Sequence, residues 1–180
     1  MLWPALPRRR LVLDPNRAVT DDRVAIFGSE VNRSGALRPT EAADPNEAIE
    51  ATIVIRRPAT AQHAAADLLA GRHSGKTREE IETQLAADPA DVKTVIDFAR
   101  RHGLTVVEQS PVKRAVRVAG TLQQMNIAFG IQLAYVAGTG GSRFLSYDGP
   151  LKVPAAVSPA ITAVLGLHRE PVASPRSARS

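Results

Sequence analysis

Residues 70–77, Ala-Gly-Arg-His-Ser-Gly-Lys-Thr, come closest in this sequence to a chemical motif. With Ala70 in the first position, they lack one glycine of the phosphate-binding pattern G-x-x-x-x-G-K-[ST]. That pattern needs a buried strand before the loop, so that backbone N–H groups and a helix dipole converge on the phosphate. The alanine-rich residues before the loop favour a helix instead. We therefore interpret the segment as a glycine turn before a helix capped by Thr77, and we predict no nucleotide cofactor.

Other reactive residue types also lack a functional spacing. The histidines show neither H-x-x-x-H nor H-E-x-x-H spacing, so no metal site is predicted; they are His63, His73, His102 and His168. The absence of cysteine excludes disulfides, thiolate metal ligands and cysteine nucleophiles. No G-x-S-x-G elbow indicates a serine nucleophile. We predict no catalytic, cofactor-binding or metal-binding residue, and no enzymatic activity of this chain by itself.

Composition indicates one domain with flexible ends. The chain has 180 residues, of which 44% are hydrophobic and 4% aromatic, so aliphatic side chains must build the core. Its formal net charge of +5 suits an acidic protein surface as well as nucleic acid. No apolar run approaches the ~20 residues of a membrane helix, and the basic cluster follows the short N-terminal apolar stretch, unlike a signal peptide. We expect no membrane partner.

The elements that would position any site follow a β-α-β-β-α-β order. Strands are predicted at residues 49–57, 104–109, 113–120 and 131–138. One helix begins at Asp88–Pro89 and ends at Gly103; the other is opened by a Thr121–Gln124 capping box and ends at Gly130. The predicted fold class is α+β, a ferredoxin-like split βαβ with a four-stranded antiparallel sheet and two helices on one face. Residues 158–167 are predicted as a further short helix.

The free face of such a sheet is a candidate binding surface. Alternation along two strands assigns to it the candidate partner-facing residues Thr105, Val107, Ala115 and Arg117. Its mixed polarity suits a dissociable protein interface. RNA-binding sheets stack bases on aromatic side chains, which residues 49–57 and 113–120 lack, so we expect no nucleic acid partner.

Three consecutive segments resemble the activation (pro) domain of the sedolisin or kumamolisin-type serine-carboxyl peptidases. The first has the pattern F-A-x-x-x-G-L-x-V, the second V-x-V-x-G and the third A-F-G; the matching residues are Phe98, Ala99, Gly103, Leu104, Val106, Val116, Val118, Gly120, Ala128, Phe129 and Gly130. Residues 26–30 and 76–80 resemble further family segments, with Phe27 in place of proline and Lys76 in place of leucine. The resemblance runs from Val24 to Arg169.

The resemblance implies a propeptide of a secreted, acid-active peptidase, acting as intramolecular chaperone and active-site inhibitor until acidification and cleavage. It implies an activation domain at residues 23–168. Residues 1–22 are Pro- and Arg-rich without periodicity and are predicted as a disordered arm, and the polar, Pro- and Ser-rich residues 169–180 are predicted as a linker. The family's S-G-T-S motif is not found here, so the expected partner is a peptidase catalytic domain in cis or in trans. Candidate processing-linker residues are His168, Arg169, Glu170, Arg176 and Arg179, and candidate pH sensors are His102 and His168. A stand-alone peptidase inhibitor or binding module is the alternative.

Overall fold

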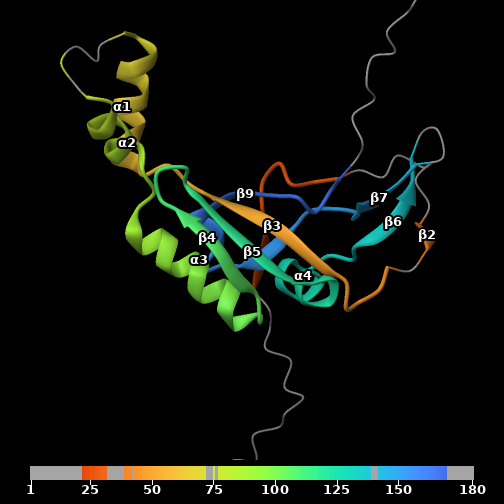
Figure 1. Ribbon diagram of the computed structural model, residues 1–180. Coiled ribbons are helices and arrows are strands. Elements are labelled where there is room, and N and C mark those ends of the chain that lie inside the picture. Colours follow the sequence, from red (N-terminus) through yellow and green to blue (C-terminus); the bar gives the residue numbers. More distant parts are fainter. Residues whose placement is uncertain are drawn as a thin grey trace, which may run out of the picture.

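The computed structural model describes residues 22–31, 39–41, 43–71, 75, 77–138 and 142–169 (Figure 1). The elements in chain order are β1 (Arg23–Ala25), β2 (Pro39–Glu41), β3 (Ala48–Ile55), α1 (Ala59–Leu69), α2 (Arg78–Leu85), α3 (Pro89–Arg101), β4 (Thr105–Ser110), β5 (Ala115–Thr121), α4 (Leu122–Phe129), β6 (Ala134–Ala137), β7 (Arg143–Ser146), β8 (Lys152–Pro154), the 3-10 helix η2 (Ser158–Ala160) and β9 (Ile161–Leu165). Within these ranges no helix has the length and apolar character needed to cross a bilayer.

The central element is a four-stranded antiparallel sheet. Its strand order is β4-β5-β3-β9, and every neighbouring pair is antiparallel. With α3 between β3 and β4, and α4 between β5 and β9, this is the ferredoxin-like split βαβ arrangement. The predicted fold class is therefore confirmed.

The fourth strand of this sheet is not the one that the sequence predicted. Residues 131–138 were expected there, but β6 pairs with β2 and β7 in a separate three-stranded sheet. The segment predicted as a short helix instead forms the single turn η2 and then β9, which supplies the fourth strand. Ser158–Pro159 opens only that turn, and the β-branched Ile161, Thr162 and Val164 favour the strand that follows.

The two core helices begin and end where their capping residues predict. The Asp88 side chain accepts a hydrogen bond from the Ala90 amide, with Pro89 at the first helical position of α3. A Thr121–Gln124 capping box opens α4, and Gly130 closes it with a positive φ of 60°. Both helices therefore present fixed faces to the sheet.

The core lies between this sheet and the two helices. The helices contribute Phe98 and Phe129, whose ring centroids are 5.9 Å apart. The sheet contributes one face of its alternating strands, namely Ile49, Ala51, Ile53, Ile55, Val116, Val118, Ile161 and Val164, all buried. α3 and α4 both lie on this face, and no helix in the part of the chain that the structure describes lies on the opposite face of the sheet (Figure 1).

A helical hairpin is inserted between β3 and α3. It consists of α1 and α2, and a Thr77–Glu80 capping box starts α2 as predicted. The hairpin projects away from the sheet (Figure 1), and α2 has no buried residue. Its helices thus depend for packing mainly on each other.

We predict that replacing a core phenylalanine by alanine destabilises the packing between the sheet and its helices. Phe98→Ala removes a fully buried ring and lowers the free energy of unfolding by about 3–5 kcal/mol. The matched control, Phe27→Ala, removes a ring that is 100% exposed and changes it by less than about 0.5 kcal/mol. Urea unfolding followed by circular dichroism measures both, and equal losses would contradict this account of the core.

Candidate functional site

The uncovered face of the four-stranded sheet is the candidate site, and we call it the open face. It consists of the side chains that alternate with the buried ones: Glu50, Thr52 and Val54 from β3; Thr105, Glu108 and Ser110 from β4; Ala115, Arg117 and Ala119 from β5; and Ala163 and Leu165 from β9. All of them are exposed or half-buried. Because successive side chains point to opposite faces of the sheet, these residues form a continuous surface across all four strands.

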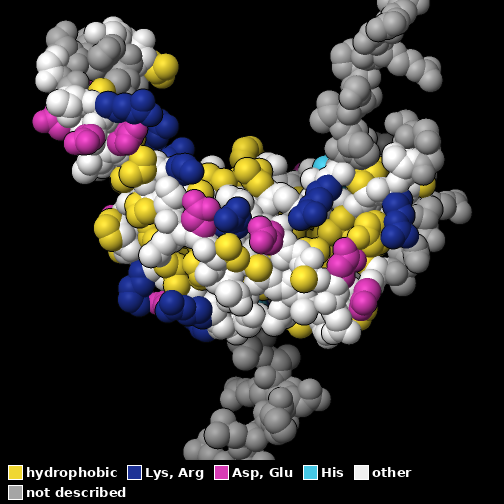
Figure 2. Space-filling model, viewed as in Figure 1, with side chains coloured by type: hydrophobic (Ala, Val, Ile, Leu, Met, Phe, Trp, Pro, Cys, Tyr) yellow, Lys and Arg dark blue, Asp and Glu magenta, His cyan; other side chains and the backbone are white. Residues whose placement is uncertain are grey.

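A cluster of three charged side chains lies at the middle of the open face. An Arg117 Nη2 atom lies 3.1 Å from a Glu108 carboxylate oxygen, and its Nε lies 3.9 Å from a Glu50 carboxylate oxygen. Figure 2 shows a basic side chain beside acidic ones at this place, with hydrophobic groups around them. Each side chain is about half exposed, at 45–54%, so the cluster is accessible to a partner.

Three of the four candidate partner-facing residues lie on the open face, and the fourth lies at a β-bulge. Thr105, Ala115 and Arg117 all lie on the open face. Val107 lies at a bulge, where the register between β4 and β5 shifts, so Glu108 and not Val107 pairs with Arg117. Val107 is nevertheless 45% exposed.

Several residues of the open face were missed by sequence reasoning. Glu50 and Thr52 follow from the alternation in residues 49–57, a signal that was present but not applied to that strand. Glu108 was missed because a bulge leaves no mark in the hydrophobic pattern. Leu165, 56% exposed, was missed because its segment was predicted as a helix.

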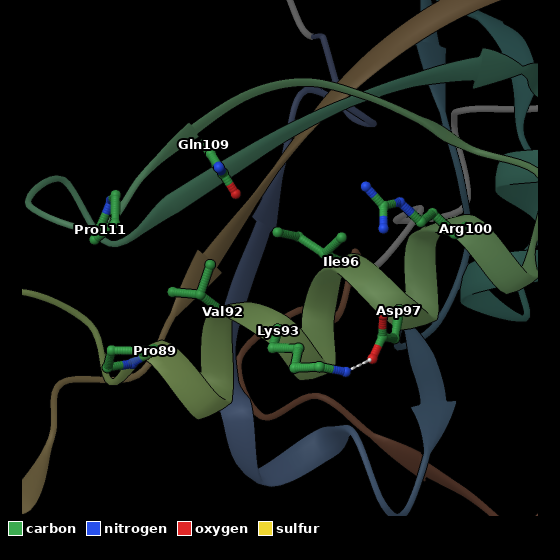
Figure 3. A pocket seen from close by; sticks show the side chains of 8 residues that line it. All are labelled: Pro89, Val92, Lys93, Ile96, Asp97, Arg100, Gln109 and Pro111. Atoms are coloured by element: carbon green, nitrogen blue, oxygen red, sulfur yellow. Dashed lines mark hydrogen bonds and ion pairs between the residues drawn. The ribbon is translucent and has the colours of Figure 1, made fainter.

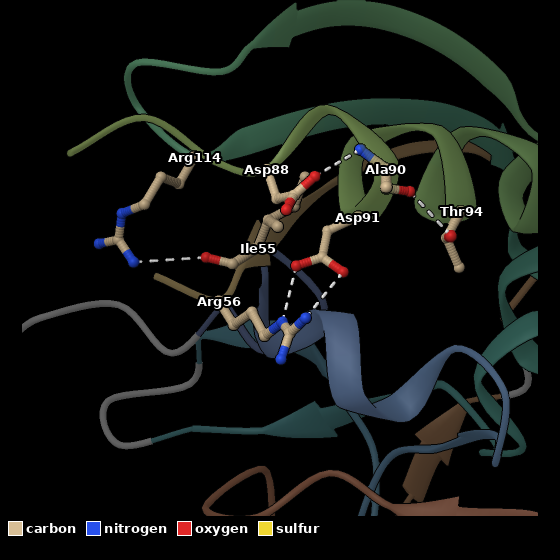
Figure 4. Close-up of polar contacts among 7 residues, drawn as sticks. All are labelled: Ile55, Arg56, Asp88, Ala90, Asp91, Thr94 and Arg114. Atoms are coloured by element: carbon tan, nitrogen blue, oxygen red, sulfur yellow. Dashed lines mark hydrogen bonds and ion pairs between the residues drawn. The ribbon is translucent and has the colours of Figure 1, made fainter. Parts of the chain in front are cut away.

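The base of the α1–α2 hairpin is fixed to the body of the domain (Figure 4). The Arg56 guanidinium donates to both carboxylate oxygens of Asp91, at 2.6 and 3.2 Å. The Arg56 amide also donates to the Ala160 carbonyl, and the Ala87 amide to the Pro111 carbonyl. The segment that enters the hairpin, at Arg56, and the segment that leaves it, at Ala87, are therefore both anchored to the body. The hairpin rises beside the sheet, and the surface is hollowed where the two meet (Figure 2).

The described chain ends beside the open face. The Arg169 amide donates to the Leu145 carbonyl at 3.0 Å, and its guanidinium donates to the carbonyls of Gly166 and Glu50. Arg169, predicted as the first linker residue, is thus bound to the domain at the strand that carries Glu50. The other linker candidates, Glu170, Arg176 and Arg179, lie outside the described residues, as does the predicted arm before residue 22.

The two candidate pH sensors occupy different places. His102 ends α3, where its Nδ1 lies 2.9 Å from the Phe98 carbonyl oxygen and its ring packs on the Phe98 ring. This position is on the helix-covered side of the sheet. His168 lies next to Arg169, with its Nδ1 3.0 Å from the Ser146 hydroxyl and its ring edge-on to Phe144. Of the two histidines, only His168 therefore adjoins Arg169, which contacts the Glu50 backbone at the edge of the open face.

The element before the glycine loop is the helix α1, as predicted, and not the strand that precedes the loop in the phosphate-binding motif. Residues 72–74, which include His73, and Lys76 lie outside the described residues; His63 lies in α1. In the described ranges no three His, Asp or Glu side chains are grouped so that they could hold a metal ion.

Comparison with known proteins identifies what the chain is similar to. The sequence model of the family described as the pro-kumamolisin activation domain matches residues 36–170. Kumamolisin from Bacillus sp. (strain MN-32) is 34% identical over 122 residues, which cover 68% of this chain and 20% of that protein. The chain therefore spans about one fifth of the length of this relative.

We predict that the Arg56–Asp91 pair holds the hairpin against the body. Asp91→Asn removes the charge that binds both guanidinium nitrogens, so amide hydrogen exchange in α1 and α2 becomes faster while that of β3 and β5 is unchanged. Asp97→Asn is the matched control, because Asp97 lies on the same helix but forms its ion pair with Lys93 of that helix. Exchange in the hairpin that responds equally to both substitutions would contradict this role.

Proposed function

This chain belongs to the pro-kumamolisin activation-domain family, and from this premise we propose that it is the propeptide of a secreted sedolisin-type serine-carboxyl peptidase. In this role it binds the peptidase domain through the open face, assists its folding and blocks its active site. The observation that carries the proposal is the one-sided cover of the sheet, which leaves a solvent-accessible face of mixed polarity. Such composition is typical of interfaces that later dissociate.

The size of the open face indicates what else must contribute. Four strands spaced by about 4.8 Å and six residues of about 3.3 Å give a footprint of roughly 400 Å². A standard interface buries about 800 Å² on each partner. The contact therefore extends beyond the sheet, and the α1–α2 hairpin, which rises beside the sheet (Figure 1), is the described segment that could add to it.

The position of Arg169 supports a direct route to the active site. Its guanidinium contacts the backbone of Glu50, so the chain that follows begins at the edge of the open face. An extended segment leaving this edge enters the cleft of a peptidase docked on the face, where it blocks the cleft and is later cut. We assign this role to the processing linker, residues 169–180.

The stand-alone inhibitor uses the same surface and remains the alternative. An open reading frame that continues past Ser180 into an S-G-T-S motif supports the propeptide, and a stop codon there supports the separate inhibitor. RNA binding is disfavoured, because the described residues of the open face include no aromatic side chain and two carboxylates.

We predict that substitution at the centre of the open face weakens inhibition. Arg117→Gln removes the only cation of the charge cluster and raises the inhibition constant against the peptidase domain of the same precursor roughly tenfold. Arg101→Gln, on the helix-covered side, leaves the constant within about twofold. The proposal fails if the chain does not inhibit at all, or if both variants inhibit like the wild type.

We predict that acid weakens the complex through the same cluster. Carboxyl groups bind protons as the pH falls from about 6 to about 3. The cluster on the open face holds two carboxylates and one guanidinium, so acidic groups outnumber the basic one there. Arg169, whose guanidinium donates to the Glu50 carbonyl, adds a positive charge at this edge. A partner matched to the neutral-pH face is therefore released in acid.

Measuring the inhibition constant from pH 7 to pH 4 tests this release. The wild-type chain should lose affinity as the pH falls, whereas the double variant Glu50→Gln, Glu108→Gln should show a flatter profile because its cluster keeps one charge state. A wild-type affinity that is constant over this range would refute acid release without affecting the inhibitory role.

A further inference from the structure

A groove on the helix-covered side of the domain lies between α3 and the edge strand β4 (Figure 3). Its volume of about 510 Å³ lies within the range of sites that hold small ligands or peptide side chains. Gln109 of β4 lines one wall, and Pro89 and Pro111 close one end. The groove is separate from the open face, because α3 covers the other side of the sheet.

The α3 wall of the groove presents an ordered row of side chains. Val92, Ile96 and Arg100 are spaced by four residues, so they lie along one flank of the helix. Val92 is 7% exposed and Ile96 is half-buried, which gives the groove an apolar floor. Arg100 stands at the end of this row, as Figure 3 shows.

The charges of the groove do not balance. Lys93 and Asp97 pair at 2.6 Å, and this hydrogen bond lowers the pKa of the Asp97 carboxyl below its usual value. Among the described residues no group accepts a hydrogen bond from the Arg100 guanidinium, and none bonds the Gln109 carboxamide. The groove therefore has one surplus cation, at the C-terminal end of α3, and an uncommitted amide on its other wall.

Among the described strands, the one that borders the groove has a free edge. β4 is the terminal strand of the sheet, and β5 is the one described strand that pairs with it. Half of its backbone N–H and C=O groups consequently point outward, and such an edge can accept a further strand from another chain. A groove beside an edge strand and a helix is one of the recurrent sites for extended peptides.

The spacing of the row matches that of an extended strand. Four helical residues advance by about 6 Å, and two strand residues advance by about 6.6 Å, so successive side chains on one face of a strand meet successive members of the row. The proximity of Pro89 to Pro111 shows that α3 and β4 run in opposite directions. A peptide that runs along α3 is therefore antiparallel to β4.

From these matches we propose that the groove binds an extended acidic segment of another protein, added as an antiparallel strand to β4. Its recognition pattern is apolar-x-apolar-x-acidic: the two apolar side chains contact Val92 and Ile96, and the carboxylate pairs with Arg100. Surplus positive charge at one end and apolar side chains along the floor fix both the direction and the register of the peptide. This site does not depend on the proposed inhibitory function.

The probe is the fluorescein-labelled peptide Ser-Val-Thr-Ile-Thr-Asp-Ser amide, titrated with the full 180-residue chain and followed by fluorescence anisotropy. Saturable binding is expected, weakened roughly tenfold by Arg100→Gln and equally by a peptide with Asn in place of Asp. A peptide N-methylated at its three consecutive central residues, Thr-Ile-Thr, should also bind more weakly, because N–H groups alternate in direction along a strand and at least one that faces β4 is then blocked.

Arg117→Gln, on the open face, is the matched control and should leave peptide binding unchanged. Inhibition of the peptidase domain should show the opposite pattern: Arg117→Gln should weaken it, and Arg100→Gln should leave it unchanged. The two proposals can therefore fail separately. Far-UV circular dichroism checks that Arg100→Gln is folded. No saturable binding, equal binding by Arg100→Gln, or a stable dimer formed through β4 that the peptide does not dissociate would each overturn the proposal.

Discussion

Phe98 of α3 and Phe129 of α4 meet in a core whose other wall is a single face of the four-stranded sheet. Because both helices lie on this one side, each strand must alternate between apolar residues that face the helices and residues that face solvent. The same packing that stabilises the fold therefore creates the open face. No further helix or strand among the described residues covers it, so its composition reflects solvent and any partner rather than the core.

Exposed ion pairs contribute only about 0–1 kcal/mol each to the stability of proteins. The Glu50–Arg117–Glu108 cluster, about half exposed, is therefore a minor term beside the burial of the core. The ion pairs within the cluster can therefore be replaced by ion pairs with a partner, and the fold loses little stability. The cluster lies in the middle of a surface that does not contribute to the core, so it is suited to recognition of a partner. The Arg56–Asp91 pair lies at the base of the hairpin, so it is suited to positioning the hairpin.

How far the sequence determines this structure can be seen at particular residues. The caps at Asp88, Thr121 and Gly130 act locally, so they fix the two core helices without knowledge of the rest. Membership of a sheet is not local: residues 134–137 and 161–165 both have strand character, and only packing against β3 selects the second as the fourth strand. The bulge at Val107 likewise leaves no signal in the hydrophobic pattern of the sequence. For this reason Glu108 was not predicted on the open face.

The open face and the groove share one element, β4. Its side chains alternate between the two surfaces, since Thr105 and Glu108 lie on the open face and Gln109 lies in the groove. A strand added at the free edge of β4 would widen the sheet by about 4.8 Å and enlarge the open face by one strand. Occupation of the groove and docking on the open face are therefore compatible in space. Both surfaces are built on β4, so a peptide added at its free edge would extend the sheet whose opposite face we propose as the docking surface.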